Sequence, residues 1–262
     1  AVTLAITGGE FVVEHGGQKT SSWTVLTISK GERLAIRAGK SGSWAYLTFA
    51  GAVVSNNWLG SHATHSTSGF GGGALQAGHA IVVAEAAIRD DRSGEIPRPD
   101  FNRDSTIRVV TGPQDRHFAK DAPERFVSDV FKVTDAYDRM GMRLSGPALE
   151  LNGALSIPSE PIVRGSVQVS GDGVPTILLA DHQTTGGYPK IATVISCDTD
   201  GLAQSRAGRA LRFTPISSRQ AIDAVRGFHA QKARYLEHIS VARGTLEQRL
   251  ARENLIHGCI HE

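Results

Sequence analysis

The chain has 262 residues, of which 40% are hydrophobic and 21% are charged, proportions typical of a folded globular protein. Its formal net charge is only +2 at pH 7, and basic and acidic residues are interleaved, which argues against a nucleic-acid-binding surface. No apolar run approaches the roughly 18 residues that a membrane-spanning helix needs. The two cysteines, Cys197 and Cys259, are too few for a disulfide framework or a cysteine-rich metal site. Both cysteines are expected to be reduced, which favours a cytoplasmic protein. The charge pattern and the lack of a long apolar run predict neither a nucleic-acid nor a membrane partner.

Short apolar runs follow one another over residues 1–85 and are separated by turn signals such as Gly8-Gly9 and Lys40-Ser41-Gly42. Strands at intervals of roughly 8–12 residues are typical of a sandwich or barrel, so residues 1–97 are predicted to form a first β-barrel domain. The chain starts inside a strand pattern and without Met, so we expect a truncated or processed start and an incomplete first domain. The expected strands lie at residues 4–7, 11–13, 25–28, 34–37, 45–50 and 81–83.

A polar stretch with two prolines, residues 89–105, is the best candidate for a linker. The strand pattern then returns, which predicts a second β-barrel domain over residues 104–216 and a mainly β fold. A short helix is expected within residues 118–130. The expected strands lie near residues 106–110, 131–133, 163–169, 176–180 and 191–196.

The pattern changes at Ser217, and residues 217–262 are predicted to form a helical tail. Ser217 or Ser218 can cap the N-terminus of a helix in which apolar residues recur at about 3.6-residue spacing, with one wider gap. A second helical segment is expected at residues 245–254. The apolar positions of the first helix are Ile222, Val225, Phe228, Tyr235 and Ile239.

The polar loop at residues 181–190 lies between two apolar strands and is the most informative part of the chain. It carries an acid, an amide, two hydroxyls, a phenol and an amine around Gly186-Gly187. Glycines permit a positive φ and let the backbone approach a ligand closely. Loops held by a rigid scaffold often carry function, whereas the alternative is a polar hairpin loop.

Two other polar sets are predicted to face the same cleft as this loop. On an extended segment Arg139 and Arg143 project to one side, where they could clamp a carboxylate or carbonate. The alternative is one structural ion pair plus an exposed arginine. Residues 160–169 alternate polar and apolar side chains, which predicts one strand face with Glu160, Arg164 and Gln168. We expect the cleft at the mouth of a closed barrel.

Other familiar motifs are weak. Gly39-Lys40-Ser41 lacks the glycine five residues earlier that a P-loop needs, and it lies between predicted strands. His62 and His65 have no nearby cysteine or carboxylate in the sequence to complete a metal site, so no metal is expected. No Gly-x-Ser-x-Gly elbow is present, so a serine-hydrolase triad is unsupported.

Together, these segments resemble the biotin-dependent carboxyltransferase-like family. It includes the C subunit of 5-oxoprolinase, allophanate hydrolase subunit 2, an antagonist of a sporulation-kinase inhibitor, and the carboxyltransferase domain of urea carboxylase. Matching segments cover almost the whole chain, and Thr-Thr-Gly-Gly-Tyr-Pro at residues 184–189 is the most specific. The others are residues 59–61, 64, 69–78, 112–114, 138–144, 160–168, 181–190, 192–194 and 208–209.

The sequence departs from the family pattern at two places. It lacks an N-terminal stretch similar to Ser-Gly-Ala-Met-Asp, which members of the family normally contain. After the glycine-rich turn it has Ala74, Leu75 and His79, where members tend to show an arginine and an acidic residue. Both departures concern the predicted first domain.

The resemblance implies two cyclophilin-like β-barrel domains and a heteromeric complex with the B-type and A-type subunits of 5-oxoprolinase. The leading hypothesis is a C-type subunit of an ATP-dependent 5-oxoprolinase, inactive by itself, in a complex that uses ATP to convert 5-oxoproline to glutamate. One alternative is biotin-dependent carboxyl transfer to urea or a related amide. The other is a non-enzymatic binding partner of a kinase inhibitor that is similar to the B-type subunit.

Under the enzymatic hypotheses the loop at residues 181–190 supplies the groups that transfer protons, and the neighbouring sets hold the substrate. The predicted catalytic residues are Asp181, Tyr188 and Lys190. The predicted substrate-binding residues are Arg139, Arg143, Glu160, Arg164, Gln168, Gln183, Thr185, Gly186 and Gly187.

Overall fold

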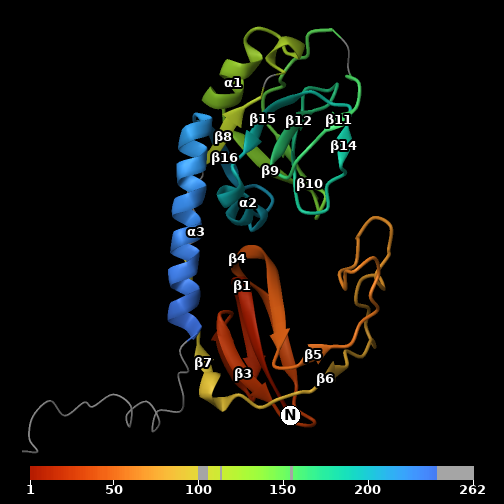
Figure 1. Cartoon of the computed structure of the whole chain (residues 1–262), viewed down its shortest axis with the longest axis vertical. Helices are drawn as coiled ribbons and strands as arrows, with labels where there is room; N and C mark the ends of the chain where they lie inside the picture. Colours follow the sequence, from red (N-terminus) through yellow and green to blue (C-terminus); the bar gives the residue numbers. More distant parts are fainter. Residues whose placement is uncertain (100–105, 113, 154–155, 241–262) are drawn as a thin grey trace, which may run out of the picture. The chain divides into compact units, whose positions relative to one another are not determined.

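The computed structural model describes residues 1–99, 106–112, 114–153 and 156–240, which form two compact units (Figure 1). Of these, unit 1 contains residues 1–63, 71–99 and 233–240, and unit 2 contains residues 64–70 and 106–232. Residues 64–70, which the strand pattern assigned to the first domain, therefore group with the second unit. The helix expected at residues 245–254 lies outside the described residues.

Unit 1 is built on a five-stranded sheet that forms a half-barrel. Strand β1 pairs along one edge with β2 and β3 and along the other with β4, while β7 pairs with β3. Leu4, Ile6 and Val13 of β1 form its buried core. The strands are β1 (Val2–His15), β2 (Gln18–Ser21), β3 (Thr24–Ile28), β4 (Leu34–Phe49) and β7 (Gly94–Glu95), and β5 (Ala52–Val53) pairs separately with β6 (Val83–Ala84).

Two strands of unit 1 run through glycines that the sequence analysis interpreted as turns. The runs at residues 4–7 and 11–13 both lie in β1, and those at 34–37 and 45–50 both lie in β4. Gly8 has a φ of +111°, and the pairing of β1 with β4 shifts its register between Gly8 and Glu10. A Cβ on Gly39 would lie 1.7 Å from the carbonyl oxygen of Glu10. These glycines therefore permit bulges and close backbone contact inside continuous strands.

The predicted linker begins within unit 1. Residues Asp90–Arg92 form a 3₁₀ helix, η1, and β7 pairs with β3 through Glu95 and Gly94. Backbone hydrogen bonds to the sheet therefore order a segment whose polar composition is typical of a linker. Residues 100–105 lie outside the described part of the chain.

Unit 2 is a closed barrel of seven strands, in the order β10-β13-β12-β15-β8-β16-β9. β16 and β8 are parallel, and the other neighbouring strands are antiparallel. The predicted mainly β fold is confirmed. The strands are β8 (Thr106–Thr111), β9 (Phe131–Tyr137), β10 (Gly141–Ser145), β12 (Ser166–Val169), β13 (Pro175–Leu178), β15 (Lys190–Val194) and β16 (Ala210–Pro215).

Side chains fill the interior of this barrel. Phe126 of α1 (Ala122–Ser128) stacks on Phe213 with ring centroids 4.3 Å apart, and Phe131 packs beside both rings. Helix α2 (Ser196–Ala203) was not predicted, because its serine, aspartates, threonine and glycine are weak helix formers. Asp198 secures it: the carboxylate accepts hydrogen bonds from the backbone N–H of Arg108 at 2.9 Å and from its Nε at 3.0 Å.

Helix α3 (Ser218–Ser240) follows β16 and begins with a capping box. Ser217 is the cap, since its Oγ accepts a hydrogen bond from the N–H of Gln220 at 3.3 Å, and Gln220 Oε1 accepts one from the N–H of Ser217 at 2.9 Å. Four of the five predicted apolar positions are half-buried, whereas Ile222 is exposed. No helix in the described part of the chain is long and apolar enough to cross a membrane.

Candidate functional site

A cavity of about 620 Å³ lies against the outer wall of the barrel in unit 2. Met142, Val167 and Ile177 point into the core, so their strand neighbours Arg143, Gln168 and Thr176 project from the opposite face. The strand register places Thr176 opposite both Arg143 and Gln168. The lining residues are Ala136, Tyr137, Asp138, Met140, Gly141, Arg143, Gln168, Ser170, Thr176, Leu178, Gln183 and Tyr188.

The location differs from the expected barrel mouth, because the interior of the barrel is closed by its own core side chains. Loop 181–190 instead contributes Gln183 and Tyr188 to a cavity on the outer wall. Arg143, Gln168, Gln183 and Tyr188 are thus the predicted site residues that share one cavity. They provide one permanent cation, two amides and one phenol, which can bind a small molecule carrying a carboxylate and an amide.

Arg139 and Arg143 do not form a joint clamp, because each binds a different carboxylate. Arg139 donates hydrogen bonds of 2.8 Å from Nε and from Nη2 to the two oxygens of Asp181. Arg143 Nη2 binds Asp172, in the turn between β12 and β13. The predicted extended segment is also wrong, because Arg139 lies in the turn between β9 and β10, whereas Arg143 lies within β10. The acceptors of both arginines come from other parts of the chain, which strand alternation cannot reveal.

Asp181 is fixed as a negative charge rather than poised for proton transfer. Its side chain is 11% exposed, and hydrogen bonds from Arg139 lower the pKa of its carboxyl group below the ordinary value. A carboxylate with a lowered pKa is a weak base near neutral pH. Ser66 Oγ adds a hydrogen bond of 3.2 Å to Asp181, and Thr67 Oγ1 contacts the Met140 sulfur at 2.9 Å. The loop at residues 64–70 was not predicted to reach this site.

The expected face of Glu160, Arg164 and Gln168 does not exist as one strand. The structure breaks the segment between β11 (Glu160–Pro161) and β12, where the N–H of Ser166 bonds the carbonyl of Val163 in a turn and Gly165 adopts a φ of +92°. Arg164 therefore points elsewhere and pairs with Asp200 at 2.8 Å. Gln168 is buried against loop 181–190, and its Nε2 lies 3.4 Å from the carbonyl oxygen of Tyr188.

Lys190 and Glu160 form a separate cluster around the buried amide of Gln114, which was not among the predicted site residues. Gln114 Oε1 accepts a hydrogen bond from the Lys190 N–H at 2.7 Å, and its Nε2 donates to Glu160 Oε2 at 2.5 Å. Lys190 Nζ lies 3.4 Å from the same Glu160 oxygen and 3.2 Å from the carbonyl of Pro161. Neither Lys190 nor Glu160 lines the cavity. The match at residues 112–114 was the available sequence signal for Gln114.

Gly186 and Gly187 are needed for close packing rather than for a positive φ, which neither adopts. A Cβ on Gly186 would lie 2.6 Å from Gln168 Nε2, and one on Gly187 would lie 3.0 Å from the carbonyl oxygen of Ile157. Thr185 and Gly186 form strand β14 (Thr185–Gly186), which pairs with β11. The two glycines therefore hold the loop against the barrel wall beside the cavity.

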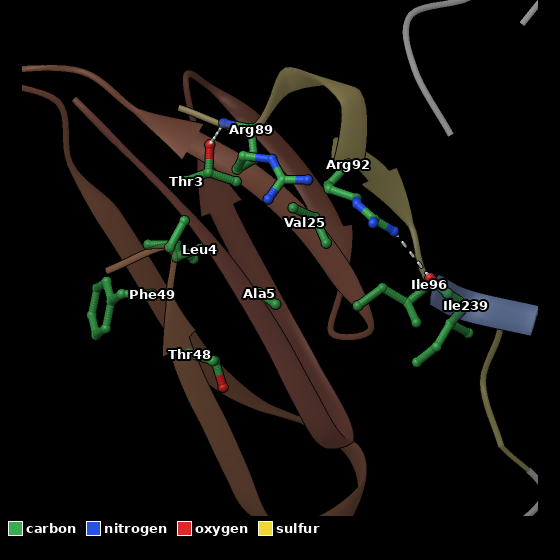
Figure 2. A pocket seen from close by; sticks show the side chains of 11 residues that line it. Thr3, Leu4, Ala5, Val25, Thr48, Phe49, Arg89, Arg92, Ile96 and Ile239 are labelled. Carbon is green, nitrogen blue, oxygen red and sulfur yellow. Dashed lines mark hydrogen bonds between the residues drawn. The ribbon is translucent and has the colours of Figure 1, made fainter. Parts of the chain in front are cut away.

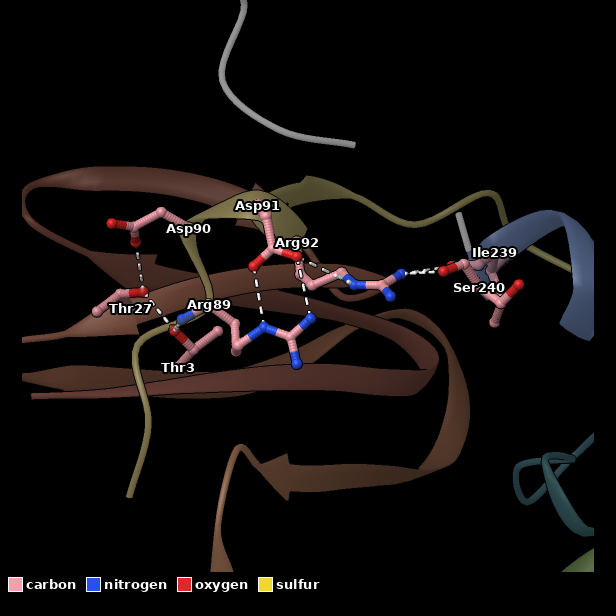
Figure 3. Close-up of polar contacts among 8 residues, drawn as sticks. All are labelled: Thr3, Thr27, Arg89, Asp90, Asp91, Arg92, Ile239 and Ser240. Atoms are coloured by element: carbon pink, nitrogen blue, oxygen red, sulfur yellow. Dashed lines mark hydrogen bonds and ion pairs between the residues drawn. The ribbon is translucent and has the colours of Figure 1, made fainter. Parts of the chain in front are cut away.

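A smaller cavity of about 300 Å³ lies in unit 1 (Figure 2). Its lining includes Ala5 and Val25 of the sheet, together with Arg89 and Arg92. Asp91 binds Arg89 at 2.9 and 3.0 Å, while Arg92 donates to the carbonyl oxygens at the end of α3 (Figure 3). Protein groups engage both guanidiniums, and the described residues that line this cavity include no amide side chain. The cavity in unit 2 combines one arginine with two amides and a phenol, so it is the better candidate for a ligand that carries a carboxylate and an amide.

The described residues contain no cluster of three or more histidine, cysteine or carboxylate side chains that could hold a metal ion. The Gly39-Lys40-Ser41 segment lies inside β4, with Gly39 tight against the backbone of β1. It therefore does not form a phosphate-binding loop at a helix N-terminus.

Comparison with known proteins identifies relatives along most of the chain. The model of the family "Carboxyltransferase domain, subdomain A and B" matches residues 1–215. The C subunit of 5-oxoprolinase from Haemophilus influenzae is 33% identical over 223 residues, which cover 84% of this chain and 71% of the relative. The Escherichia coli protein of the same name is 28% identical, with 92% and 82% covered. Urea amidolyase of Saccharomyces cerevisiae is 26% identical over 91% of this chain but only 14% of its own length.

Solved structures agree with these matches. The crystal structure of TTHA0988 superposes with a TM-score of 0.70 at 32% identity and covers 81% of this chain. This chain corresponds to 42% of that one, so it spans less than half of its length. The Kluyveromyces lactis urea amidolyase has a TM-score of 0.77 at 20% identity, covering 89% of this chain and 16% of that one, which shows a shared fold.

Proposed function

This chain belongs to the family "Carboxyltransferase domain, subdomain A and B", and we propose that it is a C-type subunit of an ATP-dependent 5-oxoprolinase complex. The observation that carries the proposal is the 33% identity to the C subunit of 5-oxoprolinase over 84% of this chain and 71% of the relative. In this role the chain acts with a B-type subunit, which it contacts directly, and with an A-type subunit. The complex converts 5-oxoproline to glutamate.

The cavity in unit 2 supports this choice of substrate chemically. 5-Oxoproline carries a carboxylate beside a lactam, which has one N–H donor and one carbonyl acceptor. Arg143 provides charged donors for the carboxylate, and the amides of Gln168 and Gln183 offer both a donor and an acceptor for the lactam. Tyr188 adds a hydroxyl beside them, on a side chain that is 46% exposed.

ATP use belongs to the complex in this proposal. Opening a lactam is a slow amide hydrolysis, and phosphorylation of the lactam oxygen by ATP would provide a better leaving group. The Gly39-Lys40-Ser41 strand segment does not fit a triphosphate, so we attribute no ATP-binding role to it. The role of this chain is to bind and orient the substrate.

Reconstitution tests the proposal. The purified chain is mixed with A-type and B-type subunits, 5-oxoproline and ATP, and glutamate release is measured. We expect release from the full mixture and none when this chain or ATP is omitted. Absence of glutamate from a full mixture whose partners are folded would overturn the proposal. Stable co-purification with the B-type subunit without any turnover would favour the non-enzymatic alternative.

Carboxyl transfer from carboxybiotin to urea or a related amide is the second candidate. It is favoured by the urea amidolyase relative, which is 26% identical over 91% of this chain. In that reaction Arg143 would hold the transferred carboxylate, since guanidinium donors suit an anion in a sheltered cavity. A carboxylation assay dependent on free biotin distinguishes the two: activity that needs biotin and urea, and that does not release glutamate from 5-oxoproline, would replace the first proposal.

A further inference from the structure

The turn between β12 and β13 presents a carboxylate to the cavity's arginine. Asp172 uses its two oxygens for different partners. Oδ1 accepts hydrogen bonds from Ser170 Oγ at 2.7 Å and from the Val174 N–H at 3.2 Å, whereas Oδ2 binds Arg143 Nη2. The hydrogen bond from Ser170, followed by the one from Arg143, lowers the pKa of Asp172 to about 2. The side chain is therefore ionised at neutral pH.

This turn is anchored, although the Asp172 side chain is half-exposed. Gly173 donates its N–H to the carbonyl of Ser170 at 2.8 Å and accepts a hydrogen bond from the Leu149 N–H at 2.9 Å. Its φ of +74° suits glycine, and a Cβ there would lie 2.9 Å from the Cβ of Ala148. The backbone thus fixes the Asp172 carboxylate relative to the barrel wall.

Arg143 is the only permanently charged cation among the described residues that line the cavity. The two neighbouring cations are engaged elsewhere, Arg139 by Asp181 and Lys190 by Glu160. A guanidinium has five N–H donors, and the Asp172 contact is made through one nitrogen, Nη2. An arginine side chain that is already held at one nitrogen loses less conformational freedom when a ligand binds its other N–H donors.

We propose that Asp172 is a positioning residue that holds Arg143 in place to bind the carboxylate of the substrate in the cavity of unit 2. The substrate named here rests on the proposed function. The inference goes beyond it by assigning carboxylate recognition to Arg143 alone of the two predicted arginines, and by giving a role to a residue in a turn that no sequence motif indicated.

The test is Asp172→Asn. The amide oxygen can still accept the hydrogen bonds from Ser170 and Val174, but the amide nitrogen that replaces Oδ2 cannot accept one from Arg143. Binding of 5-oxoproline to the full chain is measured by calorimetric titration, and glutamate release by the reconstituted complex is measured in parallel. We expect the Kd and KM to rise about tenfold, equivalent to about 1.4 kcal/mol, while kcat changes less than about twofold.

The Arg164–Asp200 pair provides a matched control. Its side chains are 40% and 53% exposed, compared with 41% and 52% for Arg143 and Asp172, and it lies outside the cavity. Asp200→Asn should therefore leave both Kd and KM unchanged. Asp172→Glu retains the negative charge on a longer side chain and should give values between those of wild type and Asp172→Asn. If Asp172→Asn does not fold, Asp172→Glu becomes the variant in which Kd and KM are measured.

The outcomes separate the two proposals. Wild-type affinity in folded Asp172→Asn, or an equal loss in Asp200→Asn, would overturn the positioning role. Absence of saturable 5-oxoproline binding by the wild-type chain would overturn the assignment of this ligand to the cavity. If the chain binds 5-oxoproline in an Asp172-dependent manner but the full mixture releases no glutamate, the proposed function fails and the inference stands.

Discussion

Arg139 and Asp181 are joined by two hydrogen bonds of 2.8 Å, between residues that are 42 positions apart in the sequence. Asp181 is nearly buried, whereas the Arg139 side chain is 42% exposed. The pair connects the β9–β10 turn to the start of loop 181–190, so it fixes the base of the loop that lines the cavity.

Asp181→Asn should lower the free energy of unfolding by about 1–3 kcal/mol, because it removes a charge-assisted hydrogen bond from a partly buried pair. Urea unfolding of the variant and wild type measures the loss. Asp200→Asn breaks an exposed pair and should cost less than about 1 kcal/mol. Equal stability losses in the two variants would contradict a special role for the Arg139–Asp181 pair.

Gln114→Leu should destabilise unit 2 by about 1–3 kcal/mol. Gln114 is buried, and its loss leaves the Lys190 N–H without its acceptor and Glu160 without the amide donor. Gln114→Glu keeps an acceptor for the Lys190 N–H but places a second carboxylate against Glu160. Its stability should therefore recover as pH falls and the introduced carboxylate becomes protonated, whereas that of Gln114→Leu should show no such recovery. Urea unfolding of both variants between neutral and mildly acidic pH provides the comparison.

Gly186→Ala should displace the Gln168 amide, because the new Cβ would lie 2.6 Å from Gln168 Nε2 and 3.1 Å from Ile162 Cδ1. The expected cost is about 1–3 kcal/mol of stability, with a loss of substrate affinity. Gly227→Ala is the matched control: its Cβ would have no neighbour within 4 Å, and alanine is favoured over glycine in a helix by about 1 kcal/mol. If Gly186→Ala is as stable as wild type, the packing role of this glycine is wrong.

The contribution of Asp172 to the free energy of unfolding should depend on pH in the acidic range. Its pKa is lowered from 3.8 to about 2 in the folded chain, so the unfolded state binds the proton more readily. The resulting stabilisation is complete above pH 3.8 and disappears as pH falls to about 2. The stability difference between wild type and Asp172→Asn should therefore shrink across this range. Thermal unfolding of both proteins at a series of pH values measures it, and a constant difference would contradict the shift.

The local pattern of residue types in the sequence was sufficient to predict several features of this protein. The strand spacing predicted a mainly β fold, and the change of period at Ser217 predicted the start of α3, which the Ser217–Gln220 capping box now accounts for. These signals depend on neighbours within one turn or one strand. For the same reason the polar loop at residues 181–190 could be recognised between its two apolar strands.

Only the tertiary structure decided which polar groups meet. Arg143 and Asp172 are 29 residues apart, and Gln114 and Lys190 are 76 residues apart, so barrel closure rather than local periodicity brings each pair together. Gly39 belongs to a Gly-Lys-Ser segment that was placed between predicted strands, yet it lies inside β4. Only the close approach of the Glu10 carbonyl oxygen shows why a side chain is excluded there. The sequence predicted one extended segment for Arg139 and Arg143, but the chain turns at Arg139, and the anchored turn at Asp172 determines what Arg143 binds.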